Sequence, residues 1–290
     1  MNRASQRGFT LSQVFVLLIL AVVVAVLLTP MWAHKRRISS LPQSMRNLKS
    51  LAQFLAVHAN ENRDALFNPF EATNAVADTW RVNPTENDLE AAHAPADSFS
   101  YFAASELCRW ADLTAKEGDY CVSPRDAHTR ERFKHRGKEV RLTPSSYWYS
   151  ATMYYSPARF AWPDSGSTAE GARWGYVQCN TFDDIRFPSQ KVTLVQKQDF
   201  GSSGRLLFSA PNAQVPLVLA DGSGMFSHNR KLIAAVQQDP SLAPSGGNWA
   251  DPSLADYGMD SKEEGLADQE GLYPAFYHWT RDGIHGRDLF

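Results

Sequence analysis

The chain has 290 residues, of which 43% are hydrophobic and 12% aromatic, and its formal net charge is −2 at pH 7. The part outside any membrane segment therefore holds enough apolar material for one substantial core. The near balance of charge argues against nucleic-acid binding. A cluster of basic residues between positions 125 and 141 also contains acidic residues, and we interpret it as a solvated loop.

The first predicted element is a long apolar helix near the N-terminus. Residues 7–30 read RGFTLSQVFVLLILAVVVAVLLTP, and the stretch from Phe9 to Leu28 would span about 30 Å as a helix, enough to cross a bilayer core. A secretory signal has a shorter apolar region and ends at a small-residue cleavage site, which the following TPMWAHKRRISS does not offer. The sequence predicts a retained transmembrane helix over residues 9–30, which Pro30 ends or kinks.

Basic residues flank this helix on both sides, so charge counting does not fix its orientation. The residues RGFTLSQ, however, resemble the N-terminal segment of type IV pilins and type II secretion pseudopilins. The resemblance implies that residues 1–8 are a leader, that a prepilin peptidase cuts between Gly8 and Phe9 on the cytoplasmic side, and that Phe9 is then methylated. A glycine at the cut lets the chain enter the peptidase in an extended form.

The same resemblance implies a location and partners. The protein would be a single-pass component of the cytoplasmic (inner) membrane, with a cytoplasmic N-terminus and an extracytoplasmic head, and would enter a pseudopilus or surface filament. Its partners would be the prepilin peptidase, other pilin-like subunits, an inner-membrane assembly platform and membrane lipid.

One residue departs from the family pattern. Pilins usually carry glutamate at the fifth mature position, where the carboxylate is thought to neutralise the N-terminal amine of a neighbouring subunit. This chain has Gln13 there. Glutamine accepts a hydrogen bond but does not compensate a charge, so we expect a minor subunit rather than a major one.

A second helical segment is predicted within residues 31–67. After a flexible break, Ser40 is a suitable N-cap, and Gln43 completes a capping-box pattern. Apolar residues then recur at spacings of three and four, as in an amphipathic helix, and we expect this stripe to pack on the head. The stripe consists of Ile38, Leu41, Met45, Leu48, Ala52, Leu55 and Ala59.

Residues 68–145 are polar and weakly periodic, and we interpret them as an insertion in the head, which spans residues 68–290. Cys108 and Cys121 would close a short loop in an oxidising compartment. The sequence leaves a disulfide and two free buried thiols as equal alternatives. Cys179 is the odd cysteine.

Residues 146–236 carry the predicted sheet. Four apolar runs, SYWYSATMYY, KVTLVQK, RLLFSA and VPLVLADG, are typical of short strands. Strands that follow one long helix predict an α+β fold in which an antiparallel sheet packs on that helix, as in pilins. Asp221 and Gly222 lie between two apolar runs and predict a hairpin turn.

A second resemblance involves this turn. VLADGSGMF is similar to a hairpin in the heads of the large pilin-like proteins of planctomycetes, which carry a histidine ten positions before the aspartate. Here that position is Pro211, and the turn has an adequate structural explanation. We therefore predict no catalytic site at the hairpin.

Residues 237–290 form a C-terminal region that we interpret as a loop over the head. Its carboxylates include Asp256, Asp260 and Asp268, which are weak candidates for a calcium site, since some pseudopilins bind calcium in a C-terminal loop. A solvated acidic loop is the simpler reading, and no other metal or cofactor is predicted. Aromatic residues near the C-terminus either pin this segment to the sheet or form a ligand surface.

The sequence contains no nucleophile elbow, phosphate-binding loop, H-E-x-x-H motif or paired C-x-x-C motif. We therefore predict a protein that is not an enzyme. The favoured function is that of a pilin-like subunit with a structural and assembly role. The alternative is a membrane-anchored extracytoplasmic binding module, which would recognise a ligand such as a polysaccharide and would not polymerise.

Overall fold

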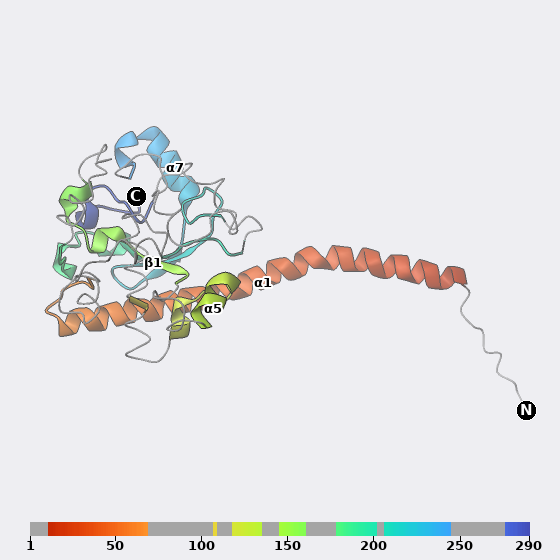
Figure 1. Ribbon diagram of the computed structural model, residues 1–290. Coiled ribbons are helices and arrows are strands. Elements are labelled where there is room, and N and C mark those ends of the chain that lie inside the picture. The colour runs from red at the N-terminus through yellow and green to blue at the C-terminus, as the bar shows by residue number, and fades with distance from the viewer. Residues whose placement is uncertain are drawn as a thin grey trace, which may run out of the picture. The chain divides into compact units, whose positions relative to one another are not determined.

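The computed structural model describes residues 11–68, 107–108, 118–134, 145–160, 178–201, 206–244 and 276–290 (Figure 1). The chain divides into two units, Met1–Pro42 and Gln43–Phe290. The boundary lies inside the first helix, so the second unit contains the last part of that helix together with the sheet.

Helix α1 extends from Leu11 to Glu61 without interruption. The prediction that Pro30 begins a flexible break was wrong, as was the prediction of a new helix start near Ser40. A proline removes one amide donor, and the hydrogen bonds on either side of it can carry the helix through. The helix ends where Arg63 and Asp64 adopt left-handed backbone angles, with φ of 56° and 62°.

The second unit contains a four-stranded antiparallel sheet with the strand order β1-β2-β3-β4. This confirms the predicted α+β class. The strands are shorter than the apolar runs in the sequence, since SATMYY turns into a 3-10 helix and RLLFSA contributes only an isolated bridge between Gln198 and Leu207. The strands are β1 (Tyr147–Tyr149), β2 (Val192–Gln196), β3 (Pro216–Leu219) and β4 (Gly224–Phe226).

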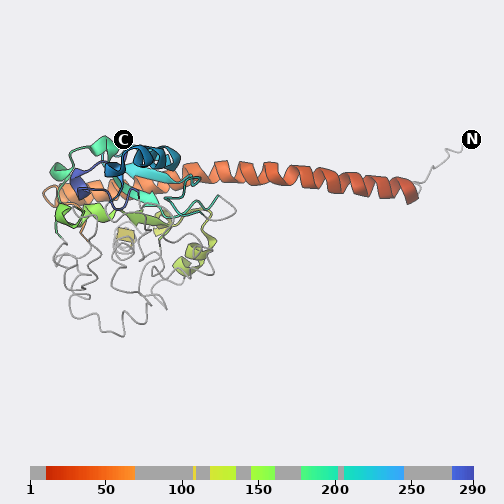
Figure 2. The same cartoon turned by 90° about the horizontal axis from the view of Figure 1, so that it is seen from above.

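Alternate strand residues face two different apolar clusters, as the pleat of a sheet requires. One cluster joins the sheet to α1 and the other joins it to helix α7 (Asn229–Gln238), so the sheet lies between these two helices (Figures 1 and 2). The α1 side contains Leu48, Leu51, Leu55, Tyr147, Tyr149, Leu194 and Val218. The α7 side contains Trp148, Val195, Leu217 and Leu232.

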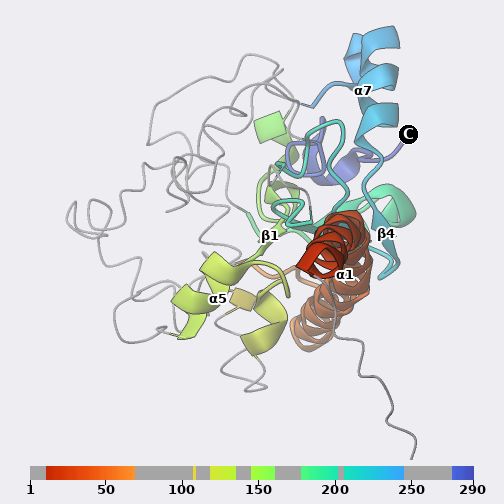
Figure 3. The same cartoon turned by 90° about the vertical axis from the view of Figure 1, so that its right-hand side faces the viewer.

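Shorter elements surround this arrangement. Helix α5 (Ala127–Lys134) and strand β4 lie on opposite sides of α1 when the molecule is viewed as in Figure 3. Strand β4 approaches α1 so closely that a Cβ atom on Gly224 would lie 2.8 Å from Cε of Lys49. The 3-10 helices are η1 (Gly118–Cys121), η2 (Ala151–Met153), η3 (Pro157–Phe160), η4 (Phe182–Asp184), η5 (Pro188–Gln190), η6 (Pro240–Leu242) and η8 (Gly283–His285).

Candidate functional site

The most unusual surface of the described chain is residues 15–26 of α1, which we call the apolar segment. All twelve residues are apolar and exposed, and the larger side chains are 46% to 66% exposed, from Val24 to Phe15. A helix that is apolar on every side is normally buried, either in a membrane or among other protein segments. The apolar segment is therefore the candidate site for assembly or anchoring.

Among the residues that the structure describes, no helix is both long enough and apolar enough to cross a membrane. The predicted cleavage residues Gly8 and Phe9 lie outside the described residues. Gln13 lies in α1, but its side chain is not among those described.

Cys108 and Cys121 form a disulfide, with Cα atoms 5.8 Å apart. Both cysteines are buried in the cluster that joins the sheet to α1, whereas Cys179 is exposed and is not in a disulfide. The Cys121 carbonyl accepts a hydrogen bond of 2.9 Å from the Ser146 amide, next to β1. The disulfide thus ties the chain around residue 108 to a segment that is itself fixed to the sheet.

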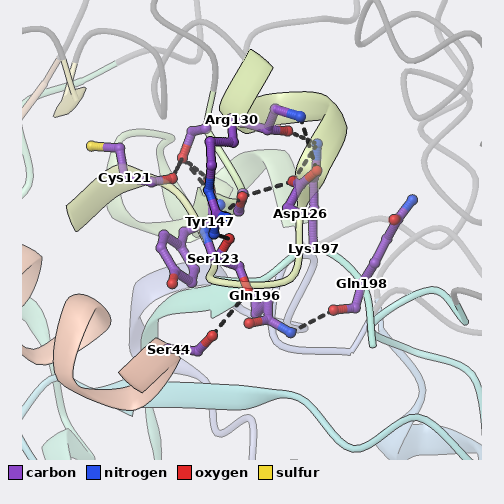
Figure 4. A network of polar contacts seen from close by, with 12 residues as sticks. Ser44, Cys121, Ser123, Asp126, Arg130, Tyr147, Gln196, Lys197 and Gln198 are labelled. Carbon is purple, nitrogen blue, oxygen red and sulfur yellow. Dashed lines mark hydrogen bonds and ion pairs between the residues drawn. The ribbon is translucent and has the colours of Figure 1, made fainter. Parts of the chain in front are cut away.

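Residues 121–130 are held to the sheet by a buried polar cluster around Asp126, which we call the Asp126 cluster (Figure 4). The Ser146 hydroxyl donates to one Asp126 carboxylate oxygen at 2.7 Å, and the Thr129 amide donates to the other at 2.9 Å. The Lys197 ammonium lies 3.7 Å from the same carboxylate and donates to the Thr129 hydroxyl at 3.2 Å.

The pKa of Asp126 follows from these contacts. Desolvation by itself would raise the pKa of this carboxyl group, but the Lys197 charge and the hydrogen bonds from Thr129 and Ser146 outweigh it, so the pKa is lowered. A carboxylate that stays ionised and has its acceptor sites occupied is a structural anchor. It is a poor candidate for an acid or base in catalysis.

Two polar residues of α1 connect this region to the helix. The Asn47 amide donates to the Val122 carbonyl at 3.0 Å and to the Tyr147 hydroxyl at 3.3 Å. The hydroxyl oxygens of Ser44 and Ser123 are 3.0 Å apart. Both α1 side chains are buried, and they lie on the face that the apolar stripe predicted for the core.

A second buried ion pair fixes the C-terminal segment to the beginning of β2. The Lys191 ammonium lies 3.4 Å from the Asp288 carboxylate, both side chains are fully buried, and the ammonium also donates to the Gly283 carbonyl at 2.7 Å. Asp288 in turn accepts hydrogen bonds from the Val192 amide at 2.7 Å and from the Thr280 hydroxyl. Burial lowers the pKa of Lys191, and the Asp288 charge counteracts part of this effect.

The predicted hairpin turn is present between β3 and β4. Gly222 has φ of 79°, its amide donates to the Leu219 carbonyl at 3.0 Å, and the Leu219 amide donates to the Ser223 carbonyl at 2.9 Å. This is a three-residue loop with its left-handed position occupied by glycine. Asp221 uses a carboxylate oxygen to accept from the Ser223 amide at 2.8 Å, which stabilises the turn.

The calcium candidates Asp256, Asp260 and Asp268 lie outside the described residues. Among the residues that are described, no group of three or more histidines, cysteines, aspartates or glutamates is arranged to hold a metal ion.

Two of the described C-terminal aromatic residues, Phe276 and Tyr277, are buried in the core, whereas Phe290 is exposed. Phe276 and Tyr277 are 3% and 1% exposed, and the Tyr277 hydroxyl donates to Asn229 at 2.8 Å. His278 is fully buried beside Trp148, and its Nδ1 accepts a hydrogen bond of 3.4 Å from the Ala151 amide. Desolvation lowers the pKa of His278 to about 3, so the imidazole is neutral.

Sequence reasoning missed the polar pairs Asp126–Lys197 and Lys191–Asp288, because each pair joins residues that are far apart in the chain. The signal in the sequence was weak: Lys191 and Lys197 flank a run of strand residues, where a charged side chain is expected to point to solvent. Their burial is visible only once their partners are placed.

Comparison with known proteins gives no match: no family model, curated protein or solved structure is similar to this chain.

Proposed function

We propose that the protein is a pilin-like subunit with a structural and assembly role in a type II secretion or type IV pilus-like system. The observation that supports this best is the apolar segment, an exposed and wholly apolar stretch of a helix whose later part belongs to the core of the head. Such a helix gains free energy by leaving water, at about 25 cal/mol per Å² of apolar surface.

The apolar segment is shorter than a bilayer core, but the apolar run in the sequence that contains it is long enough to span one. The twelve described residues would span about 18 Å, whereas the apolar run from Phe9 to Leu28 would span about 30 Å, the thickness of a bilayer core. In this proposal the run is a transmembrane helix before assembly and packs against other pilin-like subunits afterwards. The leader Met1–Gly8 is removed by a prepilin peptidase.

The Cys108–Cys121 disulfide supports an extracytoplasmic head, because disulfides persist mainly in oxidising compartments. The orientation then follows: the N-terminus lies in the cytoplasm and the head beyond the inner membrane. Gln13 in place of the usual glutamate supports a minor subunit, assembled with other subunits by an inner-membrane platform.

The test is mass spectrometry of the N-terminus of protein purified from its native host. We expect a mature chain that begins with methylated Phe9 and keeps the apolar segment. Gly8→Phe should retain the leader and prevent assembly, whereas the matched control Ala4→Phe should be processed normally.

An intact Met1 leader on the wild-type protein, with Gly8→Phe having no effect on its behaviour, would instead favour the anchored binding module. A native protein that lacks the apolar segment altogether would exclude both functions.

A further inference from the structure

The head contains an apolar cavity beside the β3–β4 turn, which is open to solvent at Ala56, Asp221 and Gly222 and has a volume of about 170 Å³. Its walls come from α1, the chain after α1, helix η4, the strands β1, β2 and β3, and the turn itself. The lining residues on which the argument depends are Ala52, Ala56, Leu66, Tyr149, Phe182, Thr193, Ala220 and Asp221.

The cavity exists because α1 presents small side chains at this level. Ala52 and Ala56 are four residues apart and so lie one above the other on the same face of the helix. One turn earlier, the fully buried Leu48 fills the corresponding space against the sheet. A leucine at position 52 would therefore be expected to occupy the cavity.

One polar side chain that lines the cavity has unmet hydrogen-bonding capacity. Tyr149 is 1% exposed, and its hydroxyl has no hydrogen-bond partner among the residues that the structure describes. By contrast, the Thr193 hydroxyl donates to the Val218 carbonyl at 3.1 Å, and Asp221 accepts from the Ser223 amide. A buried hydroxyl without a partner destabilises the folded state, and a guest that accepts its hydrogen bond would remove this cost.

We propose that this cavity is a binding site for a small neutral aromatic molecule that carries one hydrogen-bond acceptor. The volume matches one six-membered ring, since an apolar cavity of roughly 150 Å³ in another protein binds benzene. The apolar walls and the aromatic side chain of Phe182 suit a ring, and the Tyr149 hydroxyl suits the acceptor. The exposed Asp221 at the cavity disfavours an anion.

The proposed binding site does not depend on the role of the apolar segment, so the two proposals can be tested independently. All of its lining residues belong to the second unit of the chain.

The test uses two probes of similar size, benzonitrile, which has an acceptor, and toluene, which has none. The full chain is labelled at its alanine methyl groups, kept in detergent micelles and titrated at free probe concentrations measured by dialysis. We expect chemical shift changes at Ala52, Ala56 and Ala220. The methyl group of Ala234, which is exposed on α7 and does not line the cavity, should be unchanged.

Two variants then separate shape from hydrogen bonding. Tyr149→Phe should weaken benzonitrile binding about 5- to 10-fold, the effect of one lost hydrogen bond, and leave toluene binding unchanged. Ala52→Leu should abolish binding of both probes, whereas the control Val57→Leu, at an exposed position outside the cavity, should preserve it.

The wild-type titration alone can overturn the proposal, if neither probe shifts the three alanine methyl groups up to its solubility limit. Binding that survives Ala52→Leu would place the probes elsewhere on the molecule and also overturn it. Equal affinity of benzonitrile for wild type and Tyr149→Phe would remove the role of the hydroxyl, and with it the proposed ligand class.

Discussion

The buried pair of Lys191 and Asp288 gives a sharp prediction about the stability of the head. Substituting Asp288→Asn keeps the shape of the side chain and an oxygen that can accept from the Val192 amide, but removes the charge beside Lys191. Both side chains are fully buried, so the ammonium would be left without a counter-charge in a medium of low polarity.

The structure sets the magnitude. Removing one member of a buried ion pair costs about 3–5 kcal/mol. The ammonium can also escape the penalty by losing its proton. Because the ordinary pKa of lysine, 10.5, lies 3.5 above pH 7, deprotonating Lys191 at pH 7 costs about 5 kcal/mol. This value is therefore the upper limit of the loss in the free energy of unfolding. For a domain of this size, we expect a fall in melting temperature of roughly 10 °C.

The assay is urea unfolding of the head at pH 7, followed by tryptophan fluorescence, since Trp148 is 2% exposed in the native state. The double variant Lys191→Met and Asp288→Asn should be more stable than Asp288→Asn alone, because no unpaired charge remains. Lys231→Met, at an exposed position on α7, is the matched control and should change the free energy of unfolding by less than about 0.5 kcal/mol.

The reasoning would be refuted if Asp288→Asn cost less than about 1 kcal/mol. It would also be refuted if the two single substitutions were simply additive, because residues in direct electrostatic contact should show a coupling energy.

Three further predictions concern other parts of the head. Replacing Cys108 and Cys121 with alanine should lower the free energy of unfolding by about 3 kcal/mol, as expected for a disulfide that closes a loop with a sequence separation of 13. The control Cys179→Ala should have little effect, and urea unfolding midpoints with and without reductant test both expectations. The pKa of His278 falls from 6.5 to about 3 on folding, so the unfolded state binds more protons between these pH values. The free energy of unfolding should therefore decrease as the pH is lowered from 6.5 to 3, by at most about 5 kcal/mol. His278→Gln should reduce this pH dependence, and the same pH dependence in the variant and the wild type would contradict the assignment. Gly222→Ala should cost about 1 kcal/mol because its backbone is left-handed, whereas Gly222→Asn should cost less, and equal melting temperatures for the two variants would argue against this cause.

The sequence predicted the features of the fold that depend on local pattern. The spacing of apolar residues identified the buried face of α1, including Leu48, Leu55 and Ala59, and the Asp221–Gly222 pair identified the hairpin. Pro30 misled the prediction, since a proline disfavours a helix but does not forbid one whose other hydrogen bonds remain.

The parts that sequence reasoning missed are determined by tertiary contacts. The run SYWYSATMYY has strand propensity throughout, yet its bonds to β2 end at Ser150, whose amide donates to the Thr193 carbonyl. The Ser150 hydroxyl donates to the Tyr277 carbonyl at 2.9 Å, and the chain then forms a 3-10 helix. Tyr149, the polar residue of the proposed cavity, looked like any other strand aromatic. It lines the cavity together with Phe182, Leu66 and residues of α1, which no local pattern brings together.

The hydrogen bonds of Ser44 and Asn47 bear on how the head would respond to force. A purely apolar contact allows a helix to slide or rotate, because one apolar neighbour can replace another. The Asn47 side-chain amide donates to the Val122 carbonyl and the Tyr147 hydroxyl, and these two acceptors cannot be exchanged for others. A displacement of α1 by one turn, about 5.4 Å, would break both hydrogen bonds and leave the amide without acceptors. Tension applied along residues 43–61 of α1 should therefore pass into the sheet as shear, and this part of the helix should move together with the sheet.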